Sequence, residues 1–62
     1  MVERDYVTVN PTVNPRKFCV VVMRYKERED EYVPSTTSTA LPKVAADALA
    51  RGWAAALQLE IR

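Results

Sequence analysis

The densest group of side chains that could do chemistry is the stretch "KEREDE", residues 26–31. Clustered carboxylates can serve as an acid–base pair or as ligands of a hard metal ion. Here they are interleaved with two basic residues, and runs of mixed charge usually form solvated turns. We therefore interpret the stretch as the charged tip of a hairpin, with its turn near Arg28 to Asp30. The acidic residues concerned are Glu27, Glu29, Asp30 and Glu31.

Cys19 is the only cysteine, and the chain contains no histidine. Without an imidazole the usual general base near neutral pH is missing, and a thiol that lacks such a base is a poor nucleophile. Cys19 also stands next to a run of valines, where an inert core thiol is expected. The single glycine excludes a glycine-rich phosphate loop. These features predict a protein that is not an enzyme and uses no cofactor and no metal ion.

Arg24, Lys26 and Arg28 suggest a different chemistry, contact with the phosphates of a nucleic acid. A basic β-ribbon can enter a DNA groove, and Tyr25 and Tyr32 are near enough to offer stacking surfaces. However, the acidic residues of the same hairpin would repel phosphate, and the net charge of +1 provides no general basic footprint. We keep nucleic-acid binding through these three basic residues as the alternative function.

A chain of 62 residues forms at most one small domain of limited buried surface. Such domains often rely on a disulfide, a metal or a second subunit, and this composition leaves the second subunit. The first residues lack the apolar core of a signal peptide, and the apolar run Phe18–Met23 is too short to cross a bilayer. We expect a cytoplasmic protein that has no membrane contact and forms a homodimer.

Residues 18–25 predict a central strand because both of its faces are apolar. A single helix covers one face of a small sheet, so the other face would remain an exposed apolar patch, which usually marks an interaction surface. The pattern does not say which face is open. Trp53 is either a core residue at the sheet margin or an anchor for a partner. The candidate interface consists of one strand face and this tryptophan: Cys19, Val21, Met23, Tyr25 and Trp53.

The tetrapeptide Thr-Val-Asn-Pro occurs twice in succession, from Thr8 to Pro15. Asn-Pro pairs initiate turns, and proline does not fit a central strand. We interpret the repeat as a stiff connector between two strands, and a peptide motif read by another protein is the alternative. Residues 1–16 then form an N-terminal strand or arm, and residues 17–62 form a ββαβ core, within one domain.

The predicted order of elements is β-β-β-α-β, an α+β fold with a mixed sheet of three to four strands and one helix on one face. Pro34 marks the third strand as an edge strand. The helix is expected to begin with an N-cap at Ser38 or Thr39 and to continue past Gly52 to about Ala56. Its sheet-facing residues would be Leu41, Val44, Ala45, Ala48, Leu49, Gly52 and Ala56.

The terminal segment "LQLEIR" alternates between apolar and polar residues, which predicts a strand with Leu57, Leu59 and Ile61 facing inward. It should return parallel to the edge strand, with the 18–25 strand between the two.

The preferred function is that of a small non-catalytic module that binds a protein partner or homodimerises through an apolar sheet face. Chains of this size and plainness often serve as accessory regulators or inhibitors, including those encoded by phages and mobile elements. The identity of the protein partner does not follow from the residues.

Overall fold

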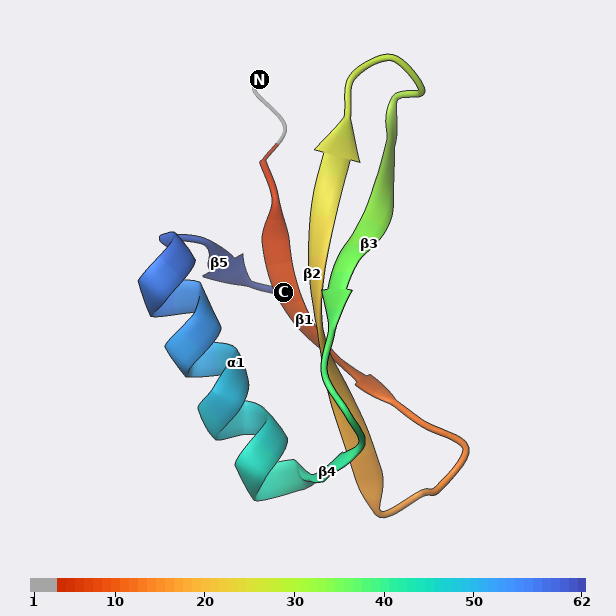
Figure 1. The fold of residues 1–62 in the computed structure, drawn as a ribbon, viewed down its shortest axis with the longest axis vertical. Helices are drawn as coiled ribbons and strands as arrows, with labels where there is room; N and C mark the ends of the chain where they lie inside the picture. The colour runs from red at the N-terminus through yellow and green to blue at the C-terminus, as the bar shows by residue number, and fades with distance from the viewer. Residues whose placement is uncertain (1–3) are drawn as a thin grey trace.

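A computed structural model describes residues 4–62 as a mixed five-stranded sheet with one helix, which confirms the predicted α+β class (Figure 1). The elements in chain order are β1 (Tyr6–Pro11), β2 (Lys17–Lys26), β3 (Glu31–Thr37), β4 (Leu41–Pro42), α1 (Lys43–Leu57) and β5 (Glu60–Ile61).

The strand order is β3-β2-β1-β5, with β4 paired to β2 beyond the end of β3. The first two strands are antiparallel from Tyr6 opposite Met23 to Pro11 opposite Phe18. This short-range pairing occupies the edge of β2 that we predicted for the terminal strand. The terminal strand β5 therefore pairs with β1, one position further out, and our predicted neighbour is wrong. The chain still returns parallel to β3, as expected.

The hairpin between β2 and β3 has its turn at residues 27–30, as the charge pattern predicted. Asp30 supplies the left-handed conformation that a glycine or asparagine often provides, with φ 51°. β3 is an edge strand, and its register with β2 shifts between Val22 and Met23, next to Pro34. A proline beside an irregular register disrupts an exposed edge and disfavours pairing with another strand.

The helix starts later than its predicted N-cap, because residues 41–42 pair with β2 instead. Pro42 stands at the N-cap position without a side-chain cap. The hydroxyl of Ser38 instead accepts the Val20 N–H at 2.8 Å. The helix continues past Gly52, as predicted, and ends at Leu57, where Gln58 adopts a left-handed conformation.

The terminal strand is shorter than its alternating pattern predicted. Leu57 belongs to the helix and is 53% exposed, and Ile61 is 47% exposed, so neither is an inward-facing strand residue. Leu59 does pack against the core. Leu57 and Gln58, the first two residues of the alternating segment, instead form the end of the helix, whose last turn is closed by the backbone N–H of Gln58.

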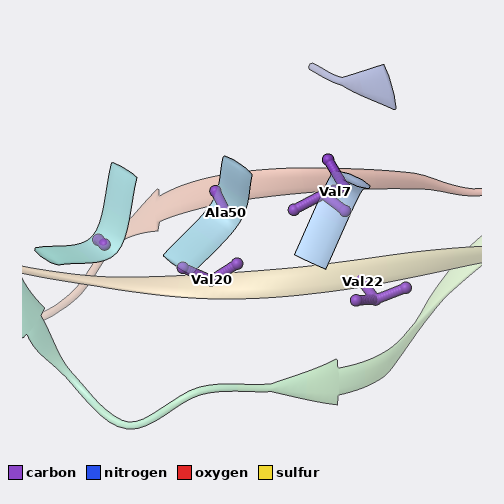
Figure 2. Packing of buried hydrophobic residues seen from close by; sticks show 6 residues of the cluster. Val7, Val20, Val22 and Ala50 are labelled. Carbon is purple, nitrogen blue, oxygen red and sulfur yellow. The ribbon is translucent and has the colours of Figure 1, made fainter. Parts of the chain in front are cut away.

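The helix buries the face opposite to the predicted one. Its buried residues are Ala46, Ala50 and Ala54, which pack on Val7, Val20 and Val22 of the sheet (Figure 2). The predicted sheet-facing residues point mostly to solvent, and Val44 is 81% exposed. The prediction failed because this alanine-rich helix is apolar on two sides, so counting apolar residues does not identify the buried one. Small alanines allow the helix axis to lie close to the valines of the sheet.

Candidate interaction surfaces

The face of the sheet opposite to α1 carries four of the five predicted interface residues. Since Val20 and Val22 pack under the helix, alternation places Cys19, Val21, Met23 and Tyr25 on the open face.

Val21 is only 5% exposed, and its cross-strand partners are Thr8 and Thr37. Cys19, Met23 and Tyr25 are half-buried. The open face is therefore mixed in polarity, and its central valine is already covered.

Three tyrosines cluster at one end of this open face. The ring centroids of Tyr6 and Tyr32 are 4.9 Å apart, and those of Tyr25 and Tyr32 are 5.3 Å apart. The guanidinium of Arg62 lies 4.7 Å from the Tyr6 ring centroid. Glu60 accepts a hydrogen bond from Arg62 Nε at 2.6 Å and raises the pKa of the guanidinium. The cluster joins β1, β2, β3 and the residues around β5, which gives these tyrosines a structural role.

Trp53 lies on the other side of the sheet from the remaining predicted interface residues. It is half-buried on α1 and packs against the core cluster. The structure therefore places Trp53 at the core margin and does not bring it together with Cys19 or Met23.

The basic residues of the hairpin lie close to one of the tyrosines, since Tyr25, Lys26 and Arg28 line one surface hollow with three acidic residues, Asp5, Glu27 and Glu29. Arg24 and Lys26 alternate with Tyr25 along β2, so they point to the helix side of the sheet. Arg24 Nε lies 3.6 Å from a carboxylate oxygen of Asp5. Tyr25 and Tyr32 point to the opposite face. The carboxylates beside Lys26 and Arg28 would repel phosphate. Nucleic-acid binding through Arg24, Lys26 and Arg28 stays the alternative prediction.

The outward face of α1 is a second apolar surface. The charged residues Lys43, Asp47 and Arg51 fall within about 80° of the helix circumference. Lys43 and Asp47 also pair with each other at 3.2 Å. The rest of the outward side carries only apolar side chains and one glycine. Its exposed members are Val44, Ala45, Ala48, Gly52, Ala55 and Ala56.

Gly52 is exposed within this outward face. A Cβ atom built there would meet nothing within 4 Å, so no contact inside the chain requires a glycine. Glycine within a helix is about 1 kcal/mol less favourable than alanine. Gly52 thus lies on an apolar helix face, as the helical spacing predicts, but that face points to solvent and not to the sheet.

Within residues 4–62, no group of three or more side chains is placed to hold a metal ion. No helix in the described part of the chain combines the length and apolar character needed to cross a membrane. A search of known family models, curated proteins and solved structures finds no match to this chain.

Proposed function

We propose that this protein is a small non-catalytic interaction module of the cytoplasm, which homodimerises and serves a partner protein as an accessory or regulatory factor. The observation that carries the proposal is the apolar outward face of α1. A helix on the surface of a monomer normally presents a polar face to water, whereas a helix that is apolar on both sides is usually buried on both. Something other than the sheet therefore covers this face.

The thin core favours a second copy as the occupant. Within residues 4–62, all the buried hydrophobic residues are valines and alanines, and the largest fully buried side chains are those of Val7 and Val20. Burying a valine contributes about 1.5–3 kcal/mol, so few large contributions are available. A small domain without disulfide or metal gains its missing stability from association. Because that support is needed whenever the protein is folded, a second copy is the natural source.

The outward face suits a two-fold contact between helices. Val44, Ala48, Gly52 and Ala56 are spaced four residues apart and form one ridge along α1. In a two-fold dimer the same ridge of the second copy would lie across it. Gly52 would then permit close approach of the two helix axes, which explains a glycine that no contact inside the chain requires.

Sedimentation equilibrium from low to high micromolar concentration tests the proposal. We expect a dimer for the natural chain and a monomer for Ala48→Glu, which places a charge within the ridge. Arg51→Glu is the matched control, since it changes an exposed residue on the charged flank of the same helix. A natural chain that is monomeric throughout, or an Ala48→Glu variant that dimerises normally, overturns association through α1.

The open sheet face remains the second candidate surface for association. Met23→Glu distinguishes it, provided that circular dichroism shows the variant to be folded. If Met23→Glu abolishes the dimer while Ala48→Glu does not, the interface is the sheet face.

Substitution of Gly52 by alanine adds an independent measurement. We expect Gly52→Ala to stabilise the monomer by about 0.5–1 kcal/mol while weakening the dimer.

A further inference from the structure

The connection between β1 and β2 is a loop ordered by hydrogen bonds among its own residues. It projects from the sheet at the end opposite to the β2–β3 hairpin tip (Figure 1). The hydroxyl of Thr12 lies 3.0 Å from the carbonyl oxygens of both Asn14 and Lys17, between which it shares its single proton. It also accepts the Asn14 N–H at 3.2 Å. Two polar side chains of the loop thus bond to its own backbone, since the Asn14 amide oxygen also accepts the Arg16 N–H at 2.9 Å.

The backbone of the loop is restrained as well. The Lys17 N–H donates to the Asn14 carbonyl at 3.0 Å and closes the turn. Pro11 and Pro15 fix their own φ angles on either side of this segment. A loop ordered in this way loses little further conformational entropy when it binds, which favours affinity.

Val13 stands at the tip of this loop and is fully exposed. Turn positions favour glycine, asparagine, aspartate, serine and proline, each for a backbone reason that valine does not share. The loop is ordered by Thr12, Asn14 and the backbone, and the fully exposed Val13 side chain adds no packing to it. The fold therefore gives no reason for an apolar β-branched residue at this position.

The charge near the loop is basic. Arg16 and Lys17 follow it directly, while the acidic run of residues 27–31 lies at the far hairpin tip. A single isopropyl group is too small to hold the chain on a lipid surface. Phosphates of a nucleic acid would meet the two basic residues but would leave Val13 without a role. A protein with a small apolar pocket and carboxylates at its rim accounts for both features.

We infer that Thr12–Arg16 is a preformed binding loop whose Val13 enters such a pocket on a different protein, with Arg16 and Lys17 against its acidic rim. The inference rests on the proposed protein-binding function and adds a surface separate from the outward face of α1. A dimer formed through the helices would carry two such loops.

Photocrosslinking captures the protein that lies against the loop in the cell. The probes are the full chain with p-benzoylphenylalanine replacing Val13, replacing Val44, or replacing Glu29 as a control at the exposed hairpin tip. Each is irradiated in an extract of the cells that make the protein, and crosslinked proteins are identified by mass spectrometry. We expect position 13 to capture one protein that Glu29 does not, and position 44 to capture a second copy of this chain.

Calorimetry with the purified captured protein then tests the role of the loop. Val13→Ala removes two methyl groups from the pocket and should weaken binding about tenfold or more. Thr12→Val keeps Val13 but loses the hydroxyl that orders the loop, and should weaken binding several-fold. Glu29→Ala changes an exposed side chain at the far hairpin tip, outside both the loop and the helix ridge, and should leave the affinity of the loop unchanged. Thermal melts verify that each variant is folded.

Three results overturn the inference: position 13 captures no protein beyond the Glu29 control, Val13→Ala binds as tightly as the natural chain, or the captured partner is a nucleic acid whose binding falls steeply with salt. If position 13 fails while position 44 links two copies of the chain, the binding loop is disproved and the proposed dimer stands. If both positions fail, the binding loop is disproved, and sedimentation equilibrium of the natural chain decides the proposed dimer.

Discussion

The two copies of Thr-Val-Asn-Pro have the same sequence and different structures. Residues 8–11 belong to β1, where Val9 packs against the core and Thr8 lies opposite Val21 of β2. Residues 12–15 leave the sheet, so that Val13 is fully exposed while Thr12 turns inward. Four identical residues thus carry no structure of their own. The presence or absence of a neighbouring strand decides whether they form a strand or a loop.

Pairing with β2 explains where the difference begins. The ladder between β1 and β2 ends at Pro11 opposite Phe18, and the chain must then reverse to reach Lys17. In the first copy the backbone pairs with β2 along one edge. In the second copy the side chains of Thr12 and Asn14 take over that role through local hydrogen bonds. Threonine and asparagine suit both settings because their short polar side chains compete readily with backbone pairing.

Replacing the valine of each copy by aspartate should give the largest difference in stability between the two copies. Val9→Asp puts a carboxylate against the apolar core and should destabilise the fold by about 3 kcal/mol or more. Val13→Asp changes a fully exposed residue and should stay within about 0.5 kcal/mol of the natural chain. Urea unfolding followed by circular dichroism measures both. Similar losses for the two variants would mean that Val13 has a packing role that its exposure contradicts.

Replacing the first residue of each copy by valine gives a smaller contrast. Thr12→Val removes the hydrogen bonds to Lys17 and Asn14 and should reduce the free energy of unfolding by about 1 kcal/mol. Thr8→Val places a good strand former next to Val21 and should leave stability unchanged or slightly raised. The same urea titrations decide, and an equal loss at both positions would contradict the assignment of Thr12 to loop ordering.

Features that depend on neighbours in the sequence were predictable. The apolar faces of β2 identified an inner strand, the mixed charges of residues 27–31 identified a turn, and Pro34 identified an edge strand. Each of these follows from alternation, solvation or backbone chemistry within a few residues. The Asn-Pro pairs predicted two turns, and Asn14 does form one. The prediction is wrong for the first pair, because Asn10 and Pro11 pair with β2 and belong to β1, so only residues 12–15 of the repeat are a connector.

Features that depend on contacts between distant segments were not predictable in the same way. The buried side of α1 could not be identified, because Val44 and Ala46 lie on two apolar faces and only the sheet decides between them. The position of β5 depended on β1 already occupying the edge of β2. The contact of Arg62 with Tyr6 follows from that position, so the tyrosine cluster could not be found from the sequence pattern.

The prolines that end the two copies should give the smallest contrast. Pro15 lies within the loop, so Pro15→Ala increases the freedom of the unfolded chain and should reduce stability by about 0.5 kcal/mol. Pro11→Ala frees the unfolded chain to the same extent, but it also restores a backbone N–H at the end of β1, where pairing with β2 favours one, so its net effect should be smaller. Thermal unfolding of the two variants side by side measures the difference. A larger loss at Pro11 would show that the strand end is held by its proline, and pairing with β2 would then no longer explain the separate structures of the two copies.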